Sequence, residues 1–165
     1  MLKKIITFSF LFFLSSSNLN AAVTVLGSSD AYICYKHAKY GSTTQSSVLT
    51  CLNAISDMTI SKKDIDASRI NLGIIYNNKS KPRMALEQFE IAFKNKNMRA
   101  EIFLNQGNSL LLLKDYKGAL EKYQASLENN LEDISAIYFN KGMAHEYLGN
   151  IDQAVSFYKK AVTLN

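Results

Sequence analysis

The chain has 165 residues, of which 47% are hydrophobic and 20% are charged, with one proline and seven glycines. So little proline and glycine disfavours turn-rich β structure, and the hydrophobic content suits one small helical domain with its own core. The formal net charge is +5, and two of the lysines lie in the first 22 residues. The charge that remains is too small to indicate nucleic acid or an anionic membrane as a partner.

The first 22 residues have the three parts of a secretory signal peptide. Two lysines precede an apolar run from Ile5 to Leu14, and small and polar residues then lead to Ala21 and Ala22. A membrane-spanning helix needs about 20 apolar residues, which is about twice the length of this run. We therefore expect cleavage near Ala21 or Ala22, no membrane span in the processed chain, and a periplasmic or secreted protein.

Two short helices are predicted next, after a β-branched stretch at residues 23–27 that either lies along the first hairpin or forms a loose tail. The first helix covers residues 29–40, with Ser29 as its N-cap and Gly41 as its stop. Ser42 opens a capping box for the second helix, which runs to about residue 56. One face of the second helix is predicted to carry Val48, Cys51, Leu52 and Ile55.

Cys34 and Cys51 are the only cysteines of the chain. Cys34 lies about six residues before the first helix ends, and Cys51 about seven residues into the second, so they are nearly level across the hairpin. An oxidising compartment would join them in a disulfide that stabilises the fold by about 3 kcal/mol. Two buried thiols and a redox pair are the alternatives, although no C-x-x-C spacing is present.

Capping residues mark the starts of the later helices. Ser61 precedes one helix, and Pro82 suits the first turn of the next, where its missing N–H costs nothing. Asp115 and Asn150 cap the second helices of two further pairs. The first helices of those pairs cover about residues 99–113 and 134–148.

Small and aromatic residues recur along the chain with a fixed period. Gly73, Gly107 and Gly142 follow one another after 34 and 35 residues. A glycine inside a helix costs up to about 1 kcal/mol, so three in register need a packing reason, which is close approach of two helices. The same period places alanines at 85, 119 and 154 and aromatic residues at 89, 123 and 158. A period of this size indicates one helical hairpin that is stacked several times.

This spacing resembles the tetratricopeptide repeat, a helix-turn-helix unit of about 34 residues. The pattern covers residues 66–92, 100–126 and 135–161, and the family's proline near each repeat end is absent. Further matches are Leu72, Tyr76, Ala92, Phe103, Tyr138 and Ala161, whereas Gln106, Ser126, Lys141 and His145 depart from the pattern. The resemblance implies an all-α fold, a right-handed superhelical stack of antiparallel helix hairpins.

The signal-peptide pattern and the resemblance together divide the chain. A signal peptide at residues 1–22 precedes a degenerate hairpin at 23–60 and a repeat region at 61–165. The three repeats of that region cover about 66–99, 100–134 and 135–165. The opening VTVLG, followed by Ala31, Cys34 and Tyr35, resembles exported bacterial tetratricopeptide proteins.

Asn71, Asn105 and Asn140 stand two residues before the three glycines, and we call them the asparagine ladder. An amide offers a donor and an acceptor, so it can pair with a peptide backbone without reading side chains. The resemblance implies that this position lines the concave face and can hold an extended peptide. The alternative is that each asparagine only bonds a neighbouring helix or faces water.

The resemblance places further, mostly apolar positions on the same face, which would suit a hydrophobic peptide or partner helix. They are Ile70, Ile74, Leu104, Asn108, Phe139, Met143 and Tyr147. The first functional hypothesis is therefore an exported scaffold that binds a peptide or partner polypeptide on its concave face. The second is a structural assembly subunit, with a homo-oligomer as one form, because no polar capping helix follows the third repeat.

No sequence feature indicates an enzyme, a cofactor or a metal. His37 and His145 lie in different hairpins, more than a hundred residues apart. A Gly-rich phosphate loop, a nucleophile elbow and an H-E-x-x-H motif are all missing from the sequence.

Overall fold

A computed structural model describes residues 20–27 and 29–164, and this part of the chain contains eight α-helices and no strand. The predicted signal peptide lies almost wholly outside the described residues. The helices are α1 (Ser29–Lys39), α2 (Gln45–Ser56), α3 (Lys62–Asn78), α4 (Pro82–Ala92), α5 (Arg99–Leu112), α6 (Tyr116–Glu128), α7 (Ile134–Tyr147) and α8 (Ile151–Thr163), with a 3₁₀ turn, η1 (Lys96–Met98), before α5.

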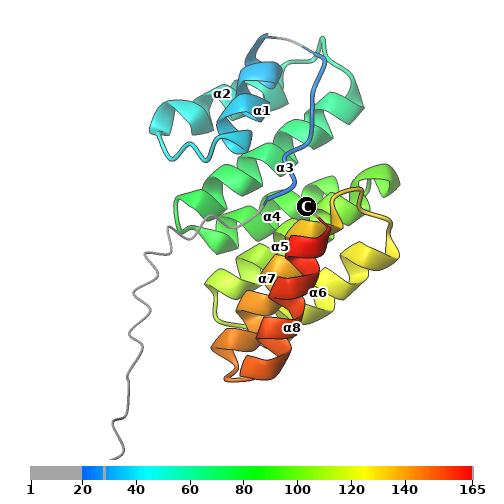
Figure 1. Cartoon of the computed structure of the whole chain (residues 1–165). Helices are drawn as coiled ribbons and strands as arrows, with labels where there is room; N and C mark the ends of the chain where they lie inside the picture. The colour runs from blue at the N-terminus through cyan, green and yellow to red at the C-terminus, as the bar shows by residue number, and fades with distance from the viewer. Residues whose placement is uncertain (1–19, 28, 165) are drawn as a thin grey trace, which may run out of the picture.

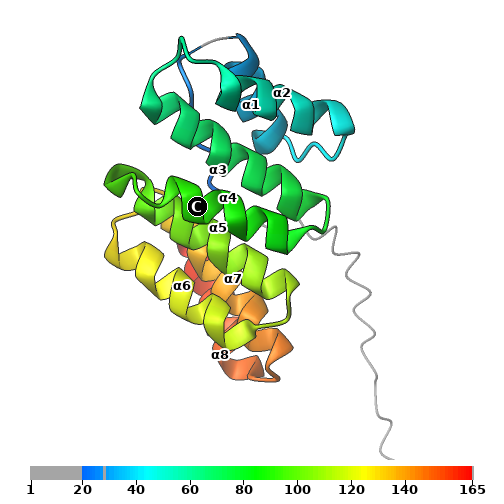
Figure 2. The same ribbon diagram turned by 180° about the vertical axis from the view of Figure 1, so that it is seen from behind.

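The helices form four antiparallel hairpins, each packed on the next (Figures 1 and 2). The first helices α1, α3, α5 and α7 also contact one another in order, so they form one continuous layer. The predicted all-α stack of helix hairpins is confirmed, and the observed helix bounds agree with the predicted ones to within one or two residues.

The helix caps follow the sequence prediction only in part. Asn150 stands at the N-cap of α8, but its side chain makes no capping hydrogen bond, and Ser29, the predicted N-cap of the first helix, is the first residue of α1. Ser61 and Asp115 accept hydrogen bonds from the N–H groups of Asp64 and Gly118, as capping residues do. The cap of α2 is Thr44, which accepts from the N–H of Ser47 at 3.1 Å, and the prediction of Ser42 was wrong. The Ser42 N–H instead closes the end of α1, where Gly41 has a φ of 70°.

An aromatic ring covers the glycine of each repeat. Phe89 lies against Gly73, Tyr123 against Gly107 and Tyr158 against Gly142, so closely that a Cβ on any of these glycines would overlap the ring. The packing reason for the three glycines is therefore specific: each makes room for the ring of its own paired helix. Ala85, Ala119 and Ala154 are buried beside these contacts.

A disulfide between Cys34 and Cys51 joins α1 and α2, with a Cα–Cα distance of 4.8 Å. Both cysteines are fully buried, and the bond between them confirms the predicted pairing rather than two thiols. The buried face of α2 carries Ser47, Val48, Cys51 and Ala54, whereas Leu52 is 42% exposed, so its predicted place on this face was wrong.

Residues 20–25, which we call the N-terminal segment, are extended and cross the first-helix layer from α3 towards α5 (Figure 1). Val25 is 1% exposed and belongs to the core formed by α1–α4. Ala22 and Val23 pack against the same core. Of the two alternatives from the sequence, the loose tail is therefore wrong, and the segment is docked.

Replacing both cysteines by alanine is expected to lower the free energy of unfolding by about 3 kcal/mol, because the bond constrains the unfolded chain. The loss should concentrate in the first hairpin, since solenoid units contact only their neighbours. Thermal unfolding with and without reductant measures it. The double variant should be insensitive to reductant, and a parent whose unfolding also ignores full reduction would contradict the expectation.

Gly107→Ala tests the ring contact, because two effects predict changes of opposite sign in the free energy of unfolding. Helix propensity alone predicts stabilisation by up to about 1 kcal/mol, whereas overlap with the Tyr123 ring predicts destabilisation by about 1–3 kcal/mol. Urea unfolding distinguishes these outcomes. A double-mutant cycle with Tyr123→Leu serves as the control, because the alanine should cost less once the ring is gone.

Candidate functional site

The asparagine ladder lies on the first-helix layer, one residue on each of α3, α5 and α7. Asn71, Asn105 and Asn140 are all fully buried. The N-terminal segment runs over α3 towards α5 and contributes to this burial (Figure 1). The site is therefore a groove along the first helices that already holds a stretch of extended backbone.

Asn71 pairs with both backbone groups of Val23. The Val23 N–H donates to Oδ1 of Asn71 at 2.9 Å, and Nδ2 of Asn71 donates to the carbonyl of Val23 at 2.8 Å. The amide thus uses its donor and its acceptor on one residue of an extended chain. This two-bond pairing involves no atom of the Val23 side chain, so it does not depend on which residue is bound.

The pairing at Asn105 is less complete. Nδ2 of Asn105 donates to the Ala21 carbonyl at 3.1 Å and to the Glu101 carbonyl of its own helix at 2.9 Å. Oδ1 of Asn105 is buried and has no hydrogen-bond partner. The second ladder position therefore holds the segment by one bond rather than two.

Asn108, one turn further along α5, connects the groove to the core. Its Nδ2 donates to the Asn20 side chain at 2.9 Å. Its Oδ1 accepts from the Tyr123 hydroxyl and from Nδ2 of Asn140, both at 2.9 Å. Burial raises the pKa of Tyr123 far above its usual value, so this hydroxyl stays a donor. Asn140 thus supports the site through Asn108.

Buried polar contacts also join the helices that carry the ladder. The Ser109 hydroxyl of α5 donates to Oδ1 of Asn77 on α3 at 2.9 Å, and Nδ2 of Asn77 donates to the Asn105 carbonyl at 3.4 Å. Such satisfied buried bonds fix the relative position of two helices. The distance between Asn71 and Asn105 is therefore set by the fold.

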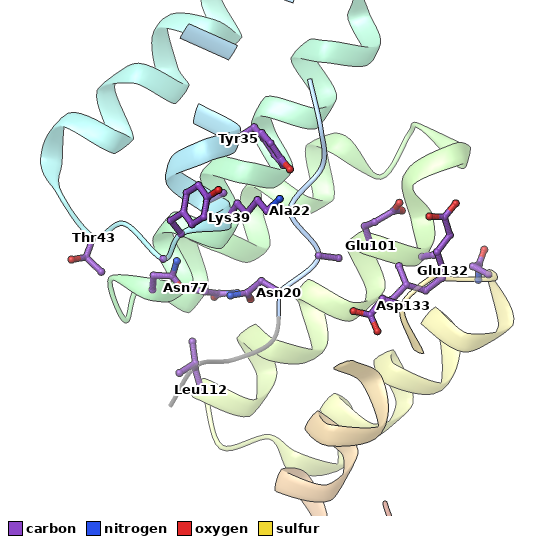
Figure 3. Close-up of a pocket in the computed structure, with 18 of the residues that line it drawn as sticks. Asn20, Ala22, Tyr35, Lys39, Thr43, Asn77, Glu101, Leu112, Glu132 and Asp133 are labelled. Atoms are coloured by element: carbon purple, nitrogen blue, oxygen red, sulfur yellow. The ribbon is translucent and has the colours of Figure 1, made fainter. Parts of the chain in front are cut away.

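A cleft of about 1090 Å³ opens on both sides of the segment (Figure 3). Tyr35, Lys39 and Asn77 line one side, and a set of carboxylates lines the other. These carboxylates, which we call the acidic side, are Glu101, Glu132 and Asp133. Hydrogen bonds, first with Lys39 and to a smaller extent with Thr24, lower the pKa of Tyr35.

Comparison with known proteins adds one finding. Residues 90–165 match the family model described as tetratricopeptide repeat. The match supports a tetratricopeptide repeat protein. It spans the end of α4 and all of the last two hairpins, and no curated protein matches the chain. Tetratricopeptide repeats commonly mediate protein–protein interactions and are in general not catalytic.

The apolar part of the predicted groove is not open surface. Ile70, Ile74 and Leu104 are fully buried, and Met143 is 6% exposed. They belong to the cores rather than to the cleft, which is lined mainly by polar residues. The expectation of an exposed apolar groove was therefore wrong for these positions, because neighbouring helices and the N-terminal segment cover them.

Two other predicted positions lie on α7, away from the paired backbone. The Phe139 ring packs against Tyr158, with 5.5 Å between the ring centroids. Tyr147 is 55% exposed and stacks on Tyr116 at 5.1 Å. Of the predicted positions, Asn71, Asn105 and Asn108 contact the segment directly, and Asn140 acts behind them.

Sequence reasoning missed the residues of the cleft walls. Glu101 stands four residues before Asn105, one helical turn away on the same face, which was a usable signal. Glu132 and Asp133 lie in the loop that holds the extra residue of the 35-residue step. Insertions in loops often carry function, so this loop could have been considered.

The described residues hold no group of three or more histidine, cysteine or carboxylate side chains that could bind a metal ion. None of the described helices is both long and apolar enough to cross a membrane.

Asn71→Ala is expected to release the N-terminal segment, because it removes both bonds to Val23. The Val23 amide should exchange with deuterium about tenfold faster or more, since each lost bond contributes about 0.5–1.5 kcal/mol. Hydrogen exchange followed by NMR measures this rate. Asn53→Ala, at an exposed asparagine of α2, is the matched control. Equal exchange in both variants would contradict the assignment.

Proposed function

We propose that this protein is a scaffold that binds an extended segment of a partner polypeptide along its asparagine ladder. The observation that carries the proposal is the pair of hydrogen bonds between Asn71 and the backbone of Val23. These bonds support the proposal, because an extended segment of another protein offers the same N–H and C=O groups as Val23.

Binding would work by preorganisation. The ladder helices are joined by the buried Asn77, Ser109 and Asn105 contacts, and the ring contacts fix each helix to its pair. A rigid groove loses little conformational entropy when a ligand binds, so most of the hydrogen-bond energy remains for affinity. The partner's side chains would be distinguished by the cleft walls, with Lys39 on one side and the acidic side opposite.

We further propose that the protein acts after export, in a periplasm or outside the cell. The predicted signal peptide at residues 1–22 motivates this localisation. The Cys34–Cys51 disulfide agrees with it, because disulfides persist mainly in oxidising compartments.

The triple variant Asn71→Ala, Asn105→Ala, Asn140→Ala tests the scaffold function. A capture experiment from the exported fraction, with cross-linking to map the contact, should recover a polypeptide on the concave face of the parent. Recovery by the triple variant should fall at least about tenfold, because several backbone bonds are lost together. Asn53→Ala should behave as the parent, and circular dichroism confirms that each variant is folded.

One observation favours an alternative, a structural assembly subunit that acts through α8. Val155 and Val162 are exposed on this helix, Val162 at 77%, and Leu164 is exposed just after it. A shallow apolar depression lies between Val155 and Val162. The variant Val155→Lys, Val162→Lys separates the two functions. If this variant loses capture or self-association while the triple asparagine variant keeps full capture, the assembly function replaces the scaffold proposal.

A further inference from the structure

The part of the N-terminal segment that fills the ladder is held through its backbone and one amide side chain. Val23 bonds to Asn71, the Ala21 carbonyl bonds to Asn105, and the Asn20 side chain bonds to Asn108. The side chains of Ala21 and Ala22 are single methyl groups, and residues 20–23 are only half-buried. Any extended segment with small side chains could make the same backbone contacts.

The fit of residues 20–23 is incomplete at Asn105. Oδ1 of Asn105 and Oε2 of Glu101 are both buried without a hydrogen-bond partner, and Glu101 lines the cleft. Buried acceptors of this kind are normally satisfied in native proteins. A bound segment that donates an N–H to Asn105, as Val23 does to Asn71, would complete the second ladder position.

The attachment of the segment differs along its length. Val25 is buried in the core of α1–α4, whereas Thr24 is exposed and residues 20–23 are half-buried. Val25 therefore anchors the segment, and residues 20–23 can leave the groove with Val25 still in the core, at the loss of the partial packing of Ala22 and Val23. The ladder can be vacated while the fold stays intact.

We propose that the groove binds an extended partner segment with small side chains in place of its own residues 20–23, which act as a built-in competitor. This inference rests on the proposed scaffold function and specifies its ligand. The footprint of Asn20 to Val23 defines the ligand: an uncharged stretch of about four residues that pairs through its backbone with Asn71 and Asn105.

A tethered competitor sets a threshold for binding. A segment joined to the site by a short link has an effective concentration on the order of 1 mM. An external segment that makes the same bonds must therefore be present above that concentration to displace it. The predicted cleavage after Ala21 or Ala22 falls inside the bound stretch and would remove Asn20 and Ala21. The processed chain should therefore bind an external segment more tightly than the uncut chain.

Val23→Pro in the full chain is the decisive variant, because proline removes the N–H that donates to Asn71 but leaves every groove residue intact. The probe is a fluorescent peptide with the sequence of residues 20–23, Asn-Ala-Ala-Val, blocked at both ends, because Val25 of the chain stays in the core. Fluorescence anisotropy should show binding at least about tenfold tighter to Val23→Pro than to the parent. Leu26→Pro, at a residue that is 94% exposed, is the matched control and should bind as the parent does.

The same proline placed in the probe should have the opposite effect and weaken binding at least about tenfold, because the ligand then lacks the N–H. Equal probe affinity in parent and Val23→Pro, or no binding to a folded Val23→Pro, would overturn the proposal. A parent that dimerises while Val23→Pro is monomeric would also overturn it, since the occupant would then be a second copy. If the ladder variant loses partner capture while Val23→Pro leaves probe affinity unchanged, the scaffold function is supported and the built-in competitor is rejected.

Discussion

Contact between an aromatic ring and a bare glycine backbone sets the helix spacing on which the rest of the molecule depends. In each repeat the ring of the second helix occupies the space that a Cβ on the first helix would fill. An α-helix turns by about 100° per residue, so a residue two positions before the glycine points about 200° away. The ladder asparagines stand at that position. The packing that holds each hairpin together therefore also turns Asn71 and Asn105 towards the groove.

The helices and their pairing could be predicted because their signals are local or periodic. Ser61, Asp115 and Pro82 each mark a helix start within a few residues, and the glycine period fixes which helices pair. Cys34 and Cys51 were predictable for the same reason, since level positions across a hairpin follow from helix length. The prediction that Ser42 caps α2 was wrong because the same residue can also end the preceding helix. Gly41 has a left-handed backbone conformation, and the N–H of Ser42 therefore bonds to the last turn of α1.

The occupant of the groove could not be predicted, because its contacts are distant in sequence. Val23 and Asn71 are 48 residues apart, and Ala21 and Asn105 are 84 apart, with no motif that links them. The prediction that apolar positions line the groove was wrong for a related reason. Ile70 and Leu104 stand beside the asparagines, but each first helix is flanked by other first helices that cover its sides. Only a narrow polar stripe of the layer is left for a ligand.

The energetics of residues 20–23 explain how a docked segment can also be a replaceable one. Hydrogen bonds to Asn71, Asn105 and Asn108 hold it, each with a net contribution of about 0.5–1.5 kcal/mol. Ordering four residues costs about 1–2 kcal/mol each, so the two terms are of similar size. When the segment leaves, the ladder amides exchange these bonds for bonds to water, and they are not left buried and unpaired. The docked and released states of residues 20–23 are therefore close in free energy. A ligand that also donates an N–H to Oδ1 of Asn105 makes one more hydrogen bond than the segment does, which favours the bound ligand.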